Sequence, residues 1–222
     1  MRKQDIFTVE QILARFPGQR EHKTIHHTGK VMNTLGYYNK NVRNYTEQTR
    51  MVDLSELYVD FEECLNPGAR ILDLGCGSGR DSKYFLEKGY SVIPVDGSAA
   101  MCIAASEYLH IPVRQMLFSE LKSKNEFDGI WACASLLHVP KTQIRDIMAK
   151  VERALKPDGV LYASFKYGEE EKNIDGRHFS FYNETDLDWI SDLGLIEYWI
   201  SEDVRLNKQG EKWLNTLWRK IA

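Results

Sequence analysis

The hydrophobic positions of this 222-residue chain follow two different periods along its length. Short apolar runs predict strands, and they cover residues 70–74, 91–95, 113–116, 128–133, 160–165, 195–200 and 213–220. Between these runs, apolar residues recur at spacings of three and four, as on one face of a helix. This second pattern predicts helices over residues 78–88, 98–109, 144–155 and 184–193.

A further amphipathic helix is predicted over residues 45–65, where apolar side chains recur at helical spacing from Met51 to Leu65. The sequence Asn66-Pro67-Gly68 ends it. Residues 1–36 show no clean period and are predicted to be an irregular or short-helical N-terminal extension.

From residue 70 onward, predicted strands and helices take turns. Such alternation is typical of an α/β protein with a mostly parallel sheet and helices on both faces. The chain has no internal repeat and no low-complexity segment. One α/β domain, over residues 37–222, is therefore the simplest interpretation.

The composition agrees with a folded globular protein, since 43% of residues are hydrophobic and 27% are charged. The longest mostly apolar stretch, residues 129–137, is too short for a membrane span, and the charged start shows no signal peptide. Four cysteines without CxxC pairing indicate reduced thiols, so we expect a cytoplasmic protein. His22, His26 and His27 lack supporting ligands, and no metal site is predicted.

The net charge of −3 is unevenly distributed. Residues 1–50 contain nine Lys or Arg against four Asp or Glu, a balance of +5, and the remainder has a balance of −8. A basic arm could help an anionic acceptor or a nucleic acid to dock, but a solvated flank explains the same scatter of charges.

Residues 71–81, Ile-Leu-Asp-Leu-Gly-Cys-Gly-Ser-Gly-Arg-Asp, carry the clearest chemical signal. A strand ends in glycines and a helix begins, so backbone amides can approach a ligand closely. The dinucleotide pattern GxGxxG would require glycine at position 80, which is Arg80, and the phosphate-binding pattern GxxxxGK[ST] is absent.

Two acids sharpen the interpretation. Asp73 lies two residues before the first glycine, where a carboxylate would repel a pyrophosphate but can attract an ammonium group, directly or through water. Asp96 ends the next strand, where it can accept hydrogen bonds from both ribose hydroxyls. Each acid could instead cap a turn or a helix. Together with the glycines, they favour S-adenosylmethionine over NAD.

These motifs, with Phe127-Asp128-Gly129-Ile130-Trp131 and residues 155–161, resemble the class I S-adenosylmethionine-dependent methyltransferases. Residues 79–82 are similar to the branch that contains the tellurite-resistance methyltransferases. The resemblance covers about residues 38–200. It implies a Rossmann-like, seven-stranded, mostly parallel sheet whose last strand is antiparallel.

The resemblance also implies cofactor contacts at the carboxyl ends of the first, second and fourth strands. Relatives often place an acid after the third strand, but this chain has Leu117 there, and the backbone of Leu117 and Phe118 could serve instead. Aromatic residues before the first long helix could form a lid or pack in the core. The expected cofactor residues are Tyr38, Arg43, Asp73, Gly75, Cys76, Gly77, Gly79, Asp96, Gly97, Ser98, Met101, Met116, Leu117, Phe118, Ala132 and Cys133.

The acceptor should lie beyond the fourth strand. Residues 132–140 lack the (Asp/Asn)-Pro-Pro-(Tyr/Phe) signature of amino-methylating DNA enzymes. His138 is a candidate base or orienting group, and it could instead cap or pack at the start of the next helix. Lys166, Tyr167 and Arg177 follow the fifth strand on the same edge, and Arg177 and Arg205 could clamp an anionic acceptor or form ordinary ion pairs.

We therefore predict a methyltransferase that acts on a small molecule or metalloid, as a monomer or homodimer. Two alternatives stay open. One is methylation of tRNA or another nucleic acid, and the other is a non-catalytic protein that binds the cofactor.

Overall fold

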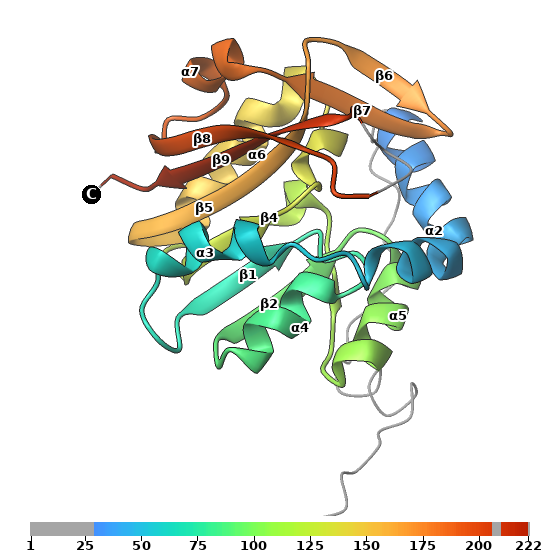
Figure 1. Cartoon of the computed structure of the whole chain (residues 1–222), viewed down its shortest axis with the longest axis horizontal. Helices are drawn as coiled ribbons and strands as arrows, with labels where there is room; N and C mark the ends of the chain where they lie inside the picture. The colour runs from blue at the N-terminus through green and yellow to red at the C-terminus, as the bar shows by residue number, and fades with distance from the viewer. Residues whose placement is uncertain (1–28, 206–209, 222) are drawn as a thin grey trace, which may run out of the picture.

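A computed structural model describes residues 29–205 and 210–221, which fold around one twisted central sheet (Figure 1). Seven strands form its main body in the order β3-β2-β1-β4-β5-β9-β8. They are β1 Arg70–Leu74, β2 Ser91–Asp96, β3 Arg114–Gln115, β4 Phe127–Ala132, β5 Leu155–Tyr167, β8 Gly194–Glu202 and β9 Lys212–Arg219. Strands β1 to β5 are parallel, and β9 pairs antiparallel with both β5 and β8. The predicted α/β fold, with an antiparallel last strand, is confirmed.

A hairpin that the sequence analysis did not predict extends the sheet. It consists of β6 Glu171–Ile174 and β7 Arg177–Tyr182, and β7 continues parallel to the end of β5. All four residues of β6 are exposed, so the strand lacks the apolar alternation that would reveal it. Asp175 and Gly176 both have positive φ, 51° and 80°, which is the two-residue turn that joins hairpin strands with the correct twist.

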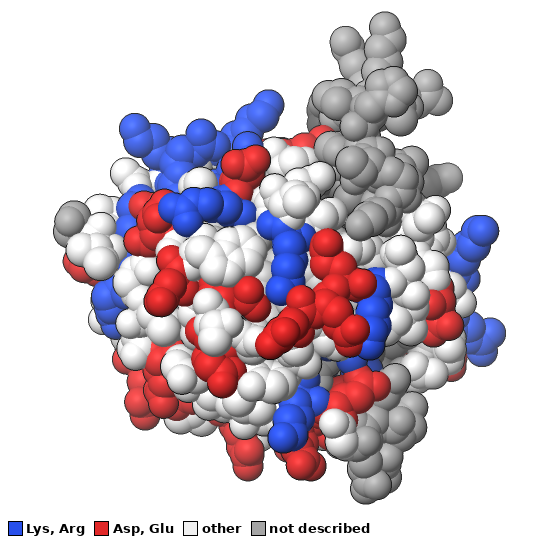
Figure 2. Space-filling model, turned by 90° about the horizontal axis from the view of Figure 1, so that it is seen from above, with Lys and Arg blue, Asp and Glu red and all other residues white. Residues whose placement is uncertain are grey.

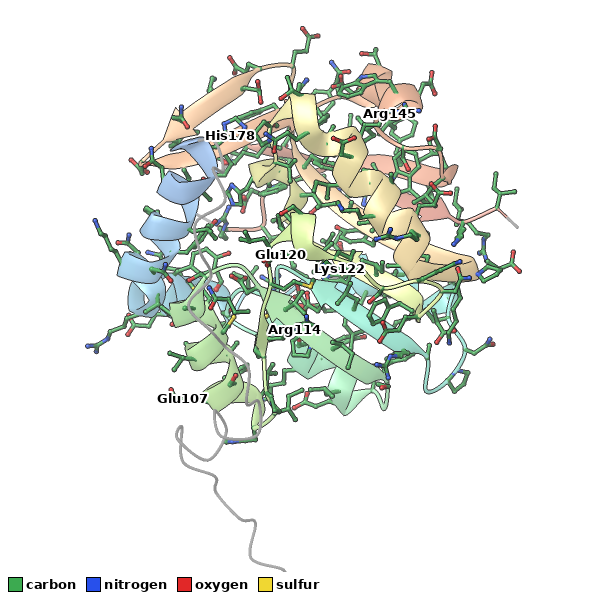
Figure 3. All side chains as sticks on the ribbon, turned by 180° about the vertical axis from the view of Figure 1, so that it is seen from behind. Glu107, Arg114, Glu120, Lys122, Arg145 and His178 are labelled. Carbon is green, nitrogen blue, oxygen red and sulfur yellow. The ribbon has the colours of Figure 1, made fainter. Side chains whose placement is uncertain are left out.

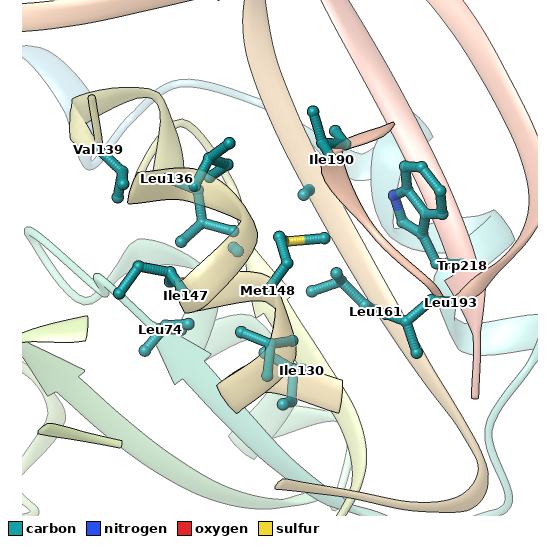
Figure 4. Close-up of a cluster of buried hydrophobic side chains, with 14 of the residues drawn as sticks. Leu74, Ile130, Leu136, Val139, Ile147, Met148, Leu161, Ile190, Leu193 and Trp218 are labelled. Atoms are coloured by element: carbon teal, nitrogen blue, oxygen red, sulfur yellow. The ribbon is translucent and has the colours of Figure 1, made fainter. Parts of the chain in front are cut away.

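Helices cover both faces of the sheet, because neighbouring strand residues point to opposite sides (Figure 1). Leu72 and Leu74 belong to a core cluster with α6 Lys141–Ala154, whereas Ile71 packs with α3 Ser55–Glu63 and α4 Arg80–Glu87. Figure 4 shows the first cluster, where Met148 lies among side chains from the strands and from α7 Leu187–Ile190. The buried α6 positions repeat every three or four residues, as predicted.

The predicted helix over residues 45–65 is wrong. Instead, α2 Gly29–Thr49 ends before a break, and α3 begins at Ser55, whose amide donates to Asp53 Oδ1 at 2.9 Å. Helix α2 also runs through the proposed boundary between residues 36 and 37, so the segment before the boundary is not all irregular. The division into an extension and a domain stays a prediction.

Helix α2 lies against the carboxyl edge of the sheet, beside β7 and α5 Ala99–Leu109 (Figure 1). Two hydrogen bonds fix it there: His178 N–H donates to Thr34 Oγ1 at 2.9 Å, and Ser98 Oγ donates to Asn39 Oδ1 at 2.7 Å. The helix therefore forms a wall over the strand ends.

Other differences from the predicted elements are small. The predicted helix over 184–193 is a 3₁₀ turn, Glu184–Asp186, followed by the single turn of α7. The predicted turn at residues 156–159 bulges within β5, since Phe127 pairs with Leu155 and Gly129 with Val160. Over the described ranges 29–205 and 210–221, no helix has the length and apolar character to span a bilayer.

Candidate functional site

The glycine turn after β1 has a backbone path that only glycine accepts. Gly75 has φ of +90°, and a Cβ there would lie 2.5 Å from Ser135 Cβ. The amides of Gly75 and Cys76 both donate to Val95 O at 2.9 Å, which fixes the turn against β2. Gly77 also has positive φ, 51°. The main chain itself therefore forms the floor at this edge.

A cavity of about 130 Å³, the small cavity, lies over the ends of β1 and β2. Its lining includes Thr34, Leu35, Gly97, Met101, Met116, Leu117, Phe118, Ser135, Val139, Gln143 and Ile147. Asp96 is its acid, and burial raises the pKa of this carboxyl, while hydrogen bonds from the amides of Ser98 (2.8 Å) and Gly77 (2.9 Å) oppose the shift. No Lys or Arg of the described residues lines this cavity. The arrangement suits an apolar group with hydroxyls better than a phosphate.

A larger cavity of about 630 Å³, the large cavity, continues over β4 and β5 toward the β6–β7 hairpin. Its charged lining residues are Asp53, Glu56, Arg80, Asp81, Lys166, Arg177, Glu202, Asp203, Arg205 and Glu211. Leu54, Leu57, Leu137, Phe179 and Trp213 add apolar surface. Both cavities share the junction, which we define as Tyr38, Tyr45, Gly75, Gly77, Ala134 and His138. A ligand that spans the junction can touch both cavities.

His138 is held at the junction in one orientation and one tautomer. Its Nδ1 lies 2.6 Å from His178 O, and since a carbonyl only accepts, Nδ1 carries the proton. Its Nε2 therefore accepts from Tyr38 Oη at 2.8 Å. Burial, together with the nearby Arg177 charge, lowers the pKa of His138 to about 4. The imidazole is neutral near pH 7, with its unprotonated nitrogen toward Tyr38.

A buried network forms one wall of the large cavity. Asp81 accepts from Tyr58 Oη at 2.7 Å, from Trp131 Nε1 at 3.0 Å and from both nitrogens of the Arg80 fork. Burial alone would raise the pKa of Asp81, but the Arg80 guanidinium and these hydrogen bonds outweigh it and hold that pKa low. Asp81 therefore ties α3, α4 and β4 together as an ionised group.

Asp73 differs from its neighbour Asp81. Only 2% of its surface is exposed, its Oδ2 accepts from Ser82 Oγ at 2.5 Å, and it lines neither cavity. Burial, with the Asp81 charge beside it, raises the pKa of Asp73 to about 8. The Asp73 carboxyl is therefore turned toward Ser82 of α4, and its contact with a ligand ammonium group, directly or through water, stays a prediction.

The structure brings most of the predicted cofactor residues to the cavities. Those that line them are Tyr38, Gly75, Cys76, Gly77, Asp96, Gly97, Met101, Met116, Leu117, Phe118 and Cys133. Of the two amides suggested for adenine, that of Leu117 donates to Glu120 Oε2 at 2.8 Å. Figure 3 shows Glu120 beside the short strand that carries Arg114.

Five predicted cofactor residues lie elsewhere. Besides Asp73, they are Arg43, which forms an exposed ion pair with Glu47, and Gly79, which caps α4 against Leu109. Ser98 caps α5 by accepting from the Met101 amide, and Ala132 is fully buried at the end of β4. In the structure these five residues cap helices, pack in the core or form surface ion pairs.

Among the predicted catalytic residues, His138, Lys166 and Arg177 line the large cavity. Tyr167 does not, because its hydroxyl donates to Glu184 Oε2 at 2.9 Å on the outside. The sequence analysis missed Ser135, Tyr58 and Asp81 as parts of the site. Of these, Asp81 had a signal, since it directly follows the glycine loop. His22, His26 and His27 lie outside the described residues, and residues 29–205 and 210–221 contain no cluster that could hold a metal ion.

Comparison with known proteins agrees with this geometry. Residues 71–159 match a family model described as a methyltransferase domain. A ubiquinone biosynthesis O-methyltransferase from Rhodopseudomonas palustris is 31% identical over 103 residues, 44% of this chain and 40% of that protein. An uncharacterised methyltransferase from Synechocystis is 28% identical over 44% of this chain and 47% of its own length. The chain thus matches less than half the length of these relatives.

Solved structures share the fold. The 1,6-didemethyltoxoflavin-N1-methyltransferase from Burkholderia thailandensis, with bound substrate and S-adenosylhomocysteine, has a TM-score of 0.69 and 21% identity, covering 90% of this chain and 94% of that one. TehB from Haemophilus influenzae has a TM-score of 0.62 and 18% identity, covering 83% and 66%. The predicted resemblance to class I methyltransferases is confirmed.

Proposed function

We propose that the chain transfers a methyl group from S-adenosylmethionine to a small molecule in the large cavity. The match of residues 71–159 to a methyltransferase-domain model supports the proposal. One observation carries the proposal. The small cavity combines the Asp96 carboxylate with apolar walls and, among the residues that the structure describes, no Lys or Arg, and it opens at the glycine turn into the large cavity. This combination fits a nucleoside without phosphates, next to room for a second substrate.

The residues on hand fit the cofactor as follows. Asp96 would accept from the ribose hydroxyls, and Met101, Met116 and Leu117 would pack on the adenine. The backbone at Gly75 and Gly77 would lie along the methionine end. When bound, the cofactor supplies an electrophilic methyl group on a sulfonium.

The chain would then accelerate the reaction mainly by positioning the methyl donor and the acceptor. The junction holds donor and acceptor in one line, and orientation of this kind supplies roughly 7–11 kcal/mol in intramolecular reactions. His138 Nε2 can take a proton from an acceptor hydroxyl or amine, directly or through the Tyr38 hydroxyl, which passes its own proton to Nε2 as it receives another. The His178 carbonyl keeps the ring in the correct tautomer throughout.

A small-molecule acceptor is supported by the enclosure of the site. Helix α2 and the β6–β7 hairpin stand over the strand ends, and acidic and basic side chains are interspersed over the face seen in Figure 2. No continuous basic track is visible on that face. Two of the proteins named above are, by their names, an O-methyltransferase of ubiquinone biosynthesis and a methyltransferase of 1,6-didemethyltoxoflavin.

Calorimetry with S-adenosylhomocysteine tests the cofactor. We expect wild-type binding and a loss of about 10-fold or more in Asp96→Asn, because the amide offers an N–H where the carboxylate accepted a hydrogen bond. Asp192→Asn, at an exposed ion pair with Arg145, is the matched control and should bind normally. Absence of wild-type binding contradicts the proposal.

Radiolabelled S-adenosylmethionine tests the acceptor. Label should move into the small-molecule fraction of a cell extract and not into RNA or protein. Transfer to RNA would instead support the nucleic-acid alternative, to which the basic balance of residues 1–50 also pointed; residues 1–28 lie outside the described residues.

A further inference from the structure

Four basic side chains of the described residues line the large cavity, and three of them are neutralised by a close carboxylate. Arg80 lies 2.6 Å from Asp81, and Arg205 lies 2.5 Å from Asp203. Lys166 forms its ion pair with Glu211. Each of these cations is thus already committed to a partner within the wall.

Arg177 is the exception. Its ion pair among the described residues is with Asp175 at 3.6 Å, and the Asp175 side chain is 73% exposed, so solvent weakens that attraction. The Arg177 side chain itself is only 19% exposed, and its buried Nε has no hydrogen-bond partner. This side chain also hydrogen-bonds the Tyr38 side chain, but that hydroxyl is neutral and does not balance the charge. A guanidinium that is largely removed from water and poorly compensated has unused capacity to bind an anion.

Two aromatic rings lie close to the Arg177 guanidinium. The guanidinium carbon lies 4.2 Å from the centre of the Tyr37 ring and 5.1 Å from that of Phe179. Aromatic rings attract the cation without accepting the hydrogen bonds that its N–H groups can donate to the two oxygens of a carboxylate. The Arg177 charge also helps lower the pKa of His138, which agrees with its place beside the junction.

We infer that the methyl acceptor is a small molecule with a carboxylate, or an equivalent anionic oxygen group, that Arg177 binds next to the junction. This inference rests on the proposed function and specifies its substrate class. The Phe179 and Trp213 rings in the same cavity favour an acceptor whose remaining part is flat and apolar. The sequence analysis also named Arg205 as a residue that could bind an anionic acceptor. We exclude Arg205 from this role because its guanidinium already donates two hydrogen bonds to Asp203.

Benzoate and benzamide are a suitable probe pair, since they have nearly the same shape and differ in charge. Their affinities are measured by ligand-observed NMR titration of protein saturated with S-adenosylhomocysteine. We expect wild-type protein to bind benzoate about 10-fold or more tightly than benzamide. Arg177→Gln should abolish the preference, and Arg177→Lys should retain part of it, because lysine keeps the charge without the fork.

Arg145→Gln is the matched control. Arg145 pairs with Asp192 on the outer side of α6, and Figure 3 shows it far from His178. Its replacement should leave the benzoate preference unchanged. If Arg177→Gln does not fold, the inference is tested by two measurements. They are the preference of wild-type protein for benzoate and the reduction of that preference in Arg177→Lys.

Three results would overturn the inference. They are equal binding of the two probes by wild-type protein, an undiminished preference in the Arg177 variants, and weaker S-adenosylhomocysteine binding in Arg177→Gln with the benzoate preference intact. The third would assign Arg177 to the carboxylate of the cofactor. Failure of the proposed function has a different signature, since wild-type protein would then not bind S-adenosylhomocysteine at all.

Discussion

The small and the large cavity differ in the kind of groups that line them. The small cavity rests on a main-chain turn at Gly75 and Gly77, with apolar side chains and one acid, Asp96. The large cavity is walled by aromatic side chains, such as Tyr45 of α2 and Trp213 of β9, and by charged side chains from the segments between these two elements. The first depends on backbone shape and the second on electrostatic balance, so the two should respond to different kinds of substitution.

The largest expected effect is steric, at Gly75. Gly75→Ala would force a left-handed alanine and place its Cβ against Ser135, and we expect the free energy of unfolding to fall by about 3 kcal/mol. Gly89→Ala is the control, because Gly89 has a similar φ of +89° with nothing within 4 Å of a Cβ. It should cost about 1 kcal/mol, from strain alone. Equal losses in urea denaturation would show that the turn is not sterically closed.

The second effect concerns the junction, where His138 is neutral. Its pKa is lowered by folding from about 6.5 to about 4, so the unfolded chain binds more protons between these values. The stability contributed by the neutral ring is therefore complete above pH 6.5 and lost as the pH falls toward 4. We expect a loss of about 3 kcal/mol over this window.

Urea denaturation of wild-type protein and His138→Asn at several pH values between 4 and 7.5 measures this contribution. Asparagine can still donate to the His178 carbonyl but has no group that titrates in this range. The variant should show a shallower decline toward acid. Parallel curves would mean that His138 titrates normally and is open to water.

Sequence alone predicts the small cavity better than the large one, for a physical reason. Strand β1, the glycine turn and α4 are consecutive, and strand β1 ends where its apolar run ends. The large cavity needs β6 and β7, and β6 is a polar, exposed strand without a hydrophobic period. Its pairing is decided by the Asp175-Gly176 turn and by the end of β5.

Asp73, near the end of β1, shows what a sequence motif leaves open. Its side chain lies on the same face of β1 as Ile71, which is buried under α3 and α4, so the pleat directs the carboxyl toward Ser82. Strand parity, applied to Asp73, would have predicted this direction. The motif predicts the resemblance to methyltransferases, but it does not predict that Ser82 is the hydrogen-bond partner of this acid.

The smallest effect tests the charge balance of the large cavity. Tyr58→Phe removes one donor from the buried Asp81, and we expect unfolding free energy to fall by about 1.5 kcal/mol, as for a hydrogen bond to a charged group. Tyr84→Phe is the matched control, because Tyr84 stacks on Tyr58 with ring centres 3.9 Å apart and its hydroxyl donates to Glu62 nearer the surface.

Both phenylalanine variants keep the stacked rings. The difference between their unfolding free energies therefore reports only which acid, Asp81 or Glu62, loses its hydrogen bond. Removal of the Tyr84 hydroxyl should cost under about 1 kcal/mol, since water can replace it at Glu62. A larger loss in Tyr84→Phe than in Tyr58→Phe would mean that Asp81 does not depend on Tyr58. Arg80 and Trp131 alone would then hold its charge, and the wall of the large cavity would be supported from α4 and β4 without α3.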